Sequence, residues 1–280
     1  MKIVANQVLH TEDKKPIVYD LYYNDTETPK PVVIFCHGYK GFKDWGAWYL
    51  VAEAFAKAGF FFLKFNFSHN GGTVEQPIDF PDLEAFAQNN YSKELEDLQR
   101  VINFVTTKNS FTSQLDRNNI SLIGHSRGGG IVLINAEENP NIKNVITWAG
   151  VSDYKGRFNE GTNEFDQWEK TGRSFVENGR TKQQMPLDFQ FYKDFKSNEE
   201  RLTIKRAVKN LKPPLLIIHG SEDPTVSQEE AKTVNQWNPK SKLKIIAGAN
   251  HVFGASHPWK ENTMPQELQE VVSNSIEFLK

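Results

Sequence analysis

The sequence lacks three features that would assign it to other protein classes. Its one cysteine, Cys36, leaves no partner for a disulfide within the chain, and a free cysteine inside an apolar run is typically a small buried core residue. No stretch approaches the ~20 apolar residues of a membrane-spanning helix. Residues 1–6 turn polar too soon for a signal peptide. These absences predict a cytoplasmic protein.

Neither sign of charge dominates the sequence. The formal net charge is −2, the isoelectric point is near 6.4, and lysine and arginine are scattered along the chain. Such a balance gives no electrostatic reason to expect nucleic acid or an anionic membrane as a partner. The 280 residues suffice for one sizeable core. We therefore expect a globular protein that acts on a small molecule.

A G-x-S-x-G pentapeptide is the most informative motif that is present. Residues 124–128 read Gly-His-Ser-Arg-Gly, directly after the apolar run 120–123. A sharp turn from a strand into a helix strains its corner residue and needs small neighbours. It would expose the Ser126 hydroxyl beside a helix N-terminus, where N–H groups can meet a developing negative charge. On its own, the pentapeptide fits a glycine-rich turn with an incidental serine equally well.

Two further apolar runs end in residues that could activate a serine. The run 215–218 is followed by Asp223, and the run 243–247 is followed by His251. If the sheet is parallel, both residues lie at the same sheet edge as Ser126. A serine nucleophile needs a base, and the base needs a carboxylate to orient it. The three residues therefore predict a Ser126–His251–Asp223 catalytic triad.

These motifs resemble those of the α/β-hydrolases, on the esterase side of that superfamily, in which the chain order is also Ser, Asp, His. The resemblance covers roughly residues 17–151 and 211–280. Upstream, a strand-like run ends in His37-Gly38-Tyr39. In hydrolases with a similar turn, the residue after His-Gly and the residue after the nucleophile donate their backbone N–H groups to the oxyanion. The resemblance thus implies an oxyanion hole formed by Tyr39 and Arg127.

Within the superfamily, the turns look similar to those of the cinnamoyl/feruloyl esterase and dienelactone-hydrolase-like group. The dienelactone hydrolases use a cysteine nucleophile, so Ser126 departs from them. The resemblance implies hydrolysis of a carboxylic ester with a short or aromatic acyl group. The triad chemistry needs neither a metal nor an organic cofactor, and the expected partner is a small-molecule ester. The sequence does not predict the oligomeric state.

The order of elements supports the same fold class. Residues 4–9 and 17–23 read as an antiparallel pair of strands, after which apolar strands alternate with amphipathic helices. One such helix is expected to begin at Ser92 as its N-cap, and a last one to span 265–279. The alternation predicts an α/β-hydrolase fold with a mostly parallel sheet and helices on both faces. This core would comprise residues 1–150 and 211–280.

Residues 151–210 interrupt the alternation and are predicted to form an inserted cap or lid. Long irregular insertions are usually functional, and α/β-hydrolases carry a cap at this place. Asn178-Gly179, between residues 173–177 and 180–184, indicates a two-residue hairpin turn. We expect most of the aromatic residues of this segment to join the cap to the core and one or two to line the pocket. They are Tyr154, Phe158, Phe165, Trp168, Phe175, Phe189, Phe191, Tyr192 and Phe195.

Other residues compete for the catalytic roles. His257 is the rival base, although it does not directly follow an apolar run, and Glu222 and Asp153 are alternatives to the predicted acid. His125 is expected to pack beneath the turn that holds the serine. The remaining motif histidines, His37 and His219, are expected to hold their loops.

Two questions stay open at this stage. The Arg127 guanidinium could brace the turn by pairing with a carboxylate on a helix, or it could face the pocket and bind a carboxylate of the substrate. The function could also be that of a prolyl-oligopeptidase-type peptidase, a thioesterase or acyltransferase, or a non-catalytic binding protein. The last is the least favoured, because the chain keeps a serine, an acid and a histidine.

Overall fold

The computed structural model describes all residues, 1–280, and contains one large and one small sheet. The strands of the large sheet are β1 (Lys2–Leu9), β2 (Ile17–Tyr23), β3 (Lys30–Cys36), β4 (Phe61–Phe65), β5 (Leu115–His125), β6 (Ile142–Trp148), β9 (Leu215–Gly220) and β10 (Lys242–Ile246). Their spatial order is β1-β2-β4-β3-β5-β6-β9-β10. The predicted antiparallel pair of strands is confirmed as β1 and β2.

From β4 to β10 the neighbouring strands are all parallel, and β2 joins them as an antiparallel neighbour of β4. The chain leaves β3 toward β4 on one side and returns to β5 on the other. In an open parallel sheet such a reversal leaves a crevice beyond the carboxyl ends of the two strands. Here the crevice lies beyond Cys36 and His125, next to the two turns singled out in the sequence.

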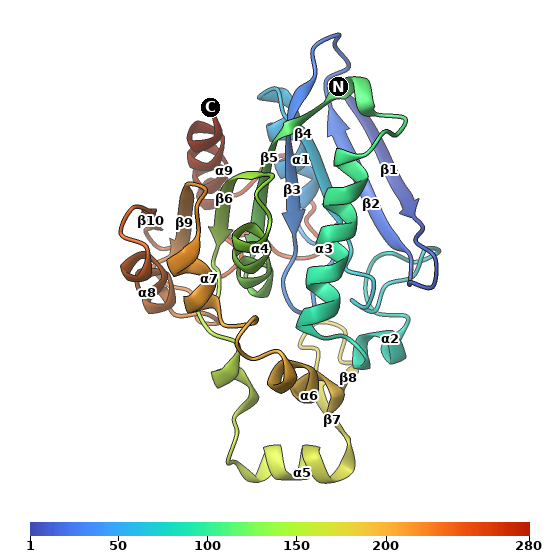
Figure 1. Ribbon diagram of the computed structural model, residues 1–280, viewed down its shortest axis with the longest axis vertical. Helices are drawn as coiled ribbons and strands as arrows, with labels where there is room; N and C mark the ends of the chain where they lie inside the picture. Colours follow the sequence, from blue (N-terminus) through green and yellow to red (C-terminus); the bar gives the residue numbers. More distant parts are fainter.

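Helices cover both faces of the sheet (Figure 1). They are α1 (Trp48–Lys57), α2 (Leu83–Ala87), α3 (Tyr91–Thr106), α4 (Arg127–Glu138), α5 (Asn163–Thr171), α6 (Gln190–Ser197), α7 (Ile204–Asn210), α8 (Gln228–Trp237) and α9 (Gln266–Leu279). Short 3₁₀ turns span Thr112–Gln114 (η1) and Lys155–Phe158 (η2). The mostly parallel sheet with helices on both faces confirms the predicted fold class.

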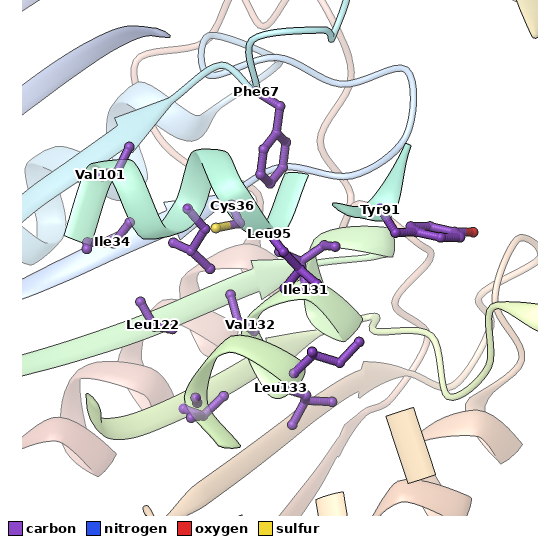
Figure 2. Packing of buried hydrophobic residues seen from close by; sticks show 14 of the residues in the cluster. Ile34, Cys36, Phe67, Tyr91, Leu95, Val101, Leu122, Ile131, Val132 and Leu133 are labelled. Carbon is purple, nitrogen blue, oxygen red and sulfur yellow. The ribbon is translucent and has the colours of Figure 1, made fainter. Parts of the chain in front are cut away.

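The core consists of two apolar layers, one on each face of the sheet. Alternate residues of β3 enter different layers: Ile34 and Cys36 pack with α3 and α4, whereas Phe35 packs with α1 and α9. This alternation follows from the two-residue period of a strand. Figure 2 shows Cys36 among Leu95 and other side chains of the α3–α4 layer, so Cys36 is the buried core residue that its surroundings in the sequence predict.

Most of residues 151–210 lie beyond one end of the sheet, away from both termini, whereas α7 packs against α4 and α8 (Figure 1). Residues 151–210 contain η2, α5, α6, α7 and a two-stranded antiparallel sheet of β7 (Arg173–Glu177) and β8 (Gln184–Asp188). The predicted hairpin therefore exists, but the two-residue turn is wrong. The connection runs over 178–183, because the Asn178 side chain accepts the N–H groups of Arg180 and Thr181 and so closes a wider loop.

Two other details differ from the sequence prediction. Helix α3 begins at Tyr91, and its N-cap is Asn90, whose side chain accepts the Lys93 N–H at 2.8 Å; Ser92 lies inside the first turn. Asparagine and serine cap helices about equally well, so the motif alone could not choose between them. None of the helices combines the length and the apolar composition that a membrane span needs.

Candidate active site

Ser126 occupies the corner between β5 and α4. Its φ of 56° and ψ of −120° place it in the left-handed half of the backbone map, which is a strained conformation for a residue with a side chain. The turn is held by a hydrogen bond from the Ser126 N–H to the Trp148 carbonyl, at 2.9 Å. A Cβ at Gly124 would lie 2.2 Å from the Gly128 carbonyl oxygen, so this corner requires glycine there.

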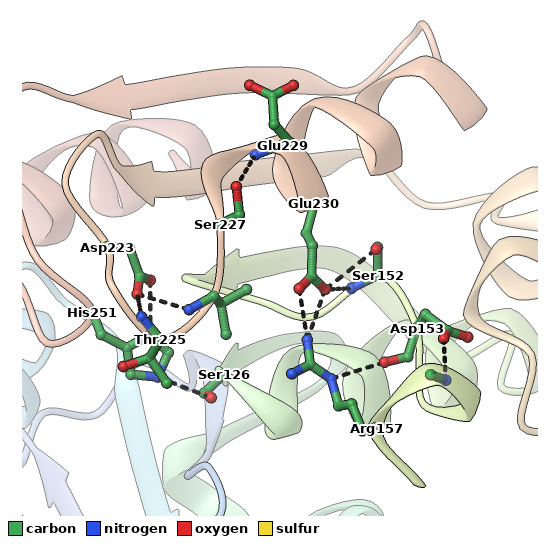
Figure 3. Close-up of polar contacts among 12 residues, drawn as sticks. Ser126, Ser152, Asp153, Arg157, Asp223, Thr225, Ser227, Glu229, Glu230 and His251 are labelled. Atoms are coloured by element: carbon green, nitrogen blue, oxygen red, sulfur yellow. Dashed lines mark hydrogen bonds and ion pairs between the residues drawn. The ribbon is translucent and has the colours of Figure 1, made fainter. Parts of the chain in front are cut away.

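The structure brings the three predicted residues together. His251 Nε2 lies 3.0 Å from Ser126 Oγ, and His251 Nδ1 lies 2.7 Å from Asp223 Oδ2 (Figure 3). A carboxylate can only accept a hydrogen bond, so the ring proton lies on Nδ1. Nε2 is then free to accept the Ser126 hydroxyl proton. This is the geometry that a serine nucleophile and its base require.

Asp223 accepts three hydrogen bonds and also contacts His219. Its Oδ1 accepts the N–H groups of Thr225 and Val226 at 2.8 and 2.9 Å, and its Oδ2 receives His251 Nδ1 and lies 3.2 Å from His219 Nε2. Burial by itself raises the pKa of the Asp223 carboxyl, but the contacts with the two histidines and Val226 outweigh it and bring the pKa well below its usual range. Asp223 is therefore ionised wherever the protein is folded near neutral pH.

His219 contributes more than the sequence predicted. Its ring is fully buried, and Nε2 faces both the Val226 carbonyl, at 2.8 Å, and the Asp223 carboxylate. It holds its loop, as expected, but it also contacts the predicted acid. The four-residue spacing between His219 and Asp223 across a strand end is the only signal of this contact in the sequence.

Two other histidines hold the surrounding loops and are neutral. Burial lowers the pKa of His125 to about 3, and Nε2 donates to the His251 carbonyl at 2.9 Å. Burial lowers the pKa of His37 to about 4; Nδ1 donates to the Gly38 carbonyl at 2.9 Å, and Nε2 accepts the Phe67 N–H at 3.3 Å. The predicted packing role of His125 thus extends to positioning the His251 backbone.

The two predicted oxyanion donors belong to segments that border Ser126. Arg127 is the first residue of α4, where N–H groups lack an intrahelical acceptor. The Tyr39 N–H donates to no protein atom. The loop that carries it approaches Ser126 closely, since a Cβ at Gly38 would lie 2.8 Å from Ser126 Cβ. Only glycine allows this approach.

A cavity of about 590 Å³ opens over Ser126 and His251. Its wall includes Tyr39, Arg127 and residues of the 151–210 segment. Six of the nine aromatic residues singled out in that segment line it: Tyr154, Phe158, Phe165, Trp168, Phe175 and Phe191. The expectation that only one or two would do so is wrong. Apart from the exposed Phe175, these aromatic residues pack against one another in one continuous layer, so those that join the segment to the core also form the cavity wall.

The comparisons with known proteins identify the family of the chain. The model of the BD-FAE family matches residues 19–237, which is most of the chain. The chain belongs to the BD-FAE family. No curated protein matches the sequence.

Several solved structures share the fold of this BD-FAE protein. Est1E from Butyrivibrio proteoclasticus with bound ferulic acid is 20% identical, with a TM-score of 0.74 over 98% of this chain and 97% of that one. The dienelactone hydrolase from Anabaena variabilis is 18% identical, with a TM-score of 0.63 over 99% and 95%. A puromycin-hydrolysing peptidase from Mycobacterium tuberculosis is 17% identical, with a TM-score of 0.63 over 94% of this chain but 37% of that one. The predicted resemblance to esterase-group α/β-hydrolases is confirmed.

The other residues considered for the catalytic base and acid lie away from Ser126 and His251. His257 Nδ1 accepts the Gly46 N–H at 2.9 Å, and its ring packs on Trp45. Asp153 accepts the N–H groups at the start of η2. The Glu222 side chain makes no hydrogen bond within the protein and faces solvent, in contrast to the buried Asp223 side chain. None of the three contacts Ser126 or His251.

Arg127 combines the two arrangements considered for it. Its guanidinium pairs with Glu94 on α3 at 3.4 Å and lies 4.1 Å from the ring centroid of Tyr39. It also forms part of the cavity wall. Glu94 balances its charge, which favours bracing of the turn over recognition of a substrate carboxylate.

Proposed function

We propose that this protein is a serine hydrolase that cleaves carboxylic esters through an acyl-enzyme. The observation that carries the proposal is the chain of contacts Ser126 Oγ–His251 Nε2, 3.0 Å, and His251 Nδ1–Asp223 Oδ2, 2.7 Å, at the floor of the aromatic cavity. Membership of the BD-FAE family and the esterase-like structural neighbours support a hydrolase of this kind.

In the first half of the reaction, Ser126 Oγ attacks the ester carbonyl while its proton passes to His251 Nε2. Asp223 keeps the His251 ring in the required tautomer and stabilises the imidazolium that forms. The backbone N–H groups of Tyr39 and Arg127 receive the oxyanion, and each such donor contributes roughly 3–4 kcal/mol of transition-state stabilisation. His251 then protonates the leaving alcohol, and the acyl group stays on Ser126.

In the second half, a water molecule repeats the attack with His251 as its base, and the acid is released. No step uses a metal or an organic cofactor. The 151–210 segment would act as the cap that encloses the substrate. Its aromatic wall fits a short or aromatic acyl group, and the ferulic acid bound to Est1E is consistent with an aromatic one.

Hydrolysis of graded esters tests the proposal. We expect the wild type to cleave p-nitrophenyl esters and methyl ferulate, and Ser126→Ala to lose ~10⁴-fold or more in kcat, because the nucleophile is gone. Ser174→Ala is the matched control, since Ser174 lines the same cavity but lies on β7. Full activity in a folded Ser126→Ala protein would exclude the serine mechanism.

A covalent label tests the acyl-enzyme step separately. A fluorophosphonate should add one adduct per chain, found on the peptide that contains Ser126 and absent from Ser126→Ala. Thioester and peptide-amide substrates in the same assay rank the alternative activities. A protein that labels at Ser126 but cleaves thioesters or amides faster than esters would be a serine hydrolase with another substrate class.

A further inference from the structure

A buried cluster of four charged side chains is attached to the loop that carries the Tyr39 N–H. Lys43 Nζ lies 2.8 Å from Asp20 Oδ1 and 2.5 Å from Asp44 Oδ2. Lys64 Nζ lies 2.6 Å from Asp20 Oδ2 and also contacts Asp44. The side chains of Lys43, Lys64 and Asp20 are at most 2% exposed, and that of Asp44 is 30% exposed. We call these four residues the ion cluster.

The ion cluster joins three separate parts of the chain. Asp20 comes from β2, Lys64 from β4, and Lys43 and Asp44 from the segment after β3. Two lysines and two aspartates balance in charge. Buried ion pairs add little net stability relative to apolar packing. Removing one partner, however, leaves a buried unpaired charge, which strongly destabilises the folded state. Such a cluster therefore penalises any movement of the segment that would separate its members.

A β-bulge in the first strand completes the cluster. The register of β1 against β2 shifts between Val4 and Gln7, and Asn6 within the shift has a φ of 51°. Its N–H donates to Asp20 Oδ1 at 2.7 Å, and its side-chain oxygen accepts Lys43 Nζ at 2.7 Å. Bulges re-aim a side chain in this way, so the edge strand β1 reaches the segment after β3.

The loop between the cluster and Ser126 is strained. Lys40, directly after Tyr39, has a φ of 54°, which is an unfavourable conformation for a residue with a side chain. The loop is fixed on the far side of Lys40, where Asn66 accepts the Lys43 N–H at 2.6 Å and Asn70 donates to the Gly41 carbonyl at 3.2 Å. Such a backbone persists only where its surroundings hold it on both sides.

We infer that the ion cluster positions the Tyr39 N–H for the oxyanion, with Lys43 and Asn6 as positioning residues. The inference rests on the proposed function, because it assigns Tyr39 to the oxyanion hole. One end of the loop is fixed by the close contact of Gly38 with Ser126, and the other end is fixed by Lys43. A donor displaced by about 1 Å loses most of its value in a transition state, even when substrate binding is unchanged.

Two variants test the inference, one that removes a buried charge and one that removes only an uncharged hydrogen-bond acceptor. Lys43→Met removes a charge from the cluster, and we expect a ~10²-fold loss in kcat with KM within about threefold. Asn6→Gly keeps the left-handed backbone and its N–H but removes the acceptor of Lys43, and we expect a roughly three- to tenfold loss in kcat. Asp13→Gly is the matched control, because Asp13 has a similar φ of 57° in the β1–β2 turn but lies outside the cluster.

A thionoester substrate distinguishes a displaced oxyanion donor from a general loss of active-site structure. Sulfur accepts hydrogen bonds weakly, so the oxyanion donors contribute less to the reaction of a thionoester than to that of the oxygen ester. The inference expects each cluster variant to lose more rate on the ester than on the matched thionoester. Equal losses on the two substrates, or no loss in Asn6→Gly, would overturn it. Because Asn6→Gly removes no buried charge, it covers the case in which Lys43→Met fails to fold.

Hydrogen exchange gives a readout that does not depend on catalysis. We expect faster amide exchange in the peptide that covers residues 38–44 in both cluster variants, and unchanged exchange there in Asp13→Gly. If the wild type cleaved no ester, the proposed function would fail, and exchange would still decide whether the cluster holds the loop. If the wild type is active and exchange is unchanged in both variants, the inference fails alone.

Discussion

The strand ends of the sheet and the 151–210 segment are built differently. At the strand ends, Asp223 is a buried carboxylate that accepts three hydrogen bonds and contacts His219, and Ser126 is fixed at a strained corner. The 151–210 segment packs on the core through its buried aromatic layer, and its polar links to the rest of the chain include ion pairs whose members are partly exposed. Examples are Arg157–Glu230, with side chains 38% and 25% exposed, and Arg173–Glu84, with 33% and 74%.

The residues of the two regions differ in kind as well. All seven histidines lie outside 151–210, whereas that segment supplies most of the aromatic wall of the cavity. Reacting groups must be held to within a fraction of an ångström, which buried strand ends can do. A wall that only has to fit a substrate does not need its polar links to be buried. We therefore expect substitutions at strand ends to change kcat and substitutions in the segment to change KM.

The largest expected effect is that of Asp223→Asn. An asparagine amide would place its NH₂ group against one of the two histidine donors and favour the wrong tautomer of His251, and we expect kcat to fall ~10⁴-fold. Steady-state kinetics on a p-nitrophenyl ester measures it. Glu222→Gln, which changes the neighbouring exposed carboxylate, is the control and should keep wild-type kinetics. A loss below tenfold in Asp223→Asn would assign the orienting role to another residue.

Next in size is Gly38→Ala. The added methyl group would lie 2.8 Å from Ser126 Cβ and 3.2 Å from the His125 carbonyl oxygen, so the loop must move and carry the Tyr39 N–H with it. We expect a loss of ~10² to 10³-fold in kcat. Gly179→Ala, in the β7–β8 loop, meets nothing within 4 Å and should leave kcat unchanged. Wild-type kcat in a folded Gly38→Ala protein would remove Tyr39 from the oxyanion hole.

The difference between the strand ends and the 151–210 segment also explains which features could be predicted from the sequence. Ser126, Asp223 and His251 each follow an apolar strand within five residues, and parallel strands bring such positions to one edge. Local pattern and sheet geometry together were therefore enough to predict the contacts that the structure contains. The same reasoning predicted the β1–β2 pair, the alternation of strands and helices, and the last helix.

Features that depend on long-range packing were not predictable. The bulge at Asn6 is visible only once β1 pairs with β2, and the contact of His219 with Asp223 depends on how the loop after β9 folds back. The Asn178 loop closed over six residues because its side chain bonded the backbone, which competes with a tight turn. The number of aromatic residues in the cavity wall likewise follows from packing in three dimensions.

The stability of the strand-end region should depend on acidity. Burial lowers the pKa of His125 to about 3 and that of His37 to about 4, against about 6.5 in the unfolded chain. The unfolded state then binds more protons below pH 6.5, so the free energy of unfolding falls as the pH falls from 6.5 toward these values. Each histidine contributes up to about 1.4 kcal/mol per pH unit.

Urea unfolding at pH 7, 6 and 5 measures this slope. His125→Gln keeps a donor for the His251 carbonyl. It should reduce the dependence of the unfolding free energy on pH by the contribution of one histidine. His10→Gln changes an exposed histidine near the N-terminus and should leave the slope unchanged. An unchanged slope in His125→Gln would mean that His125 takes up its proton in the folded protein as readily as in the unfolded chain.

The smallest expected effect lies in the 151–210 segment. Arg157 donates two hydrogen bonds to Glu230, at 2.7 and 2.8 Å, and Glu230 also accepts the Ser152 N–H, so the pair ties η2 to α8 beside the cavity (Figure 3). Solvent screens partly exposed pairs to at most about 1 kcal/mol. We expect Arg157→Ala to raise KM two- to fivefold with kcat nearly unchanged. Arg201→Ala breaks a similar exposed pair with Glu138 away from the cavity and should not affect KM. A fall in kcat larger than the rise in KM would show that this segment also positions the reacting groups. The expectation that strand-end substitutions change kcat and segment substitutions change KM would then be wrong.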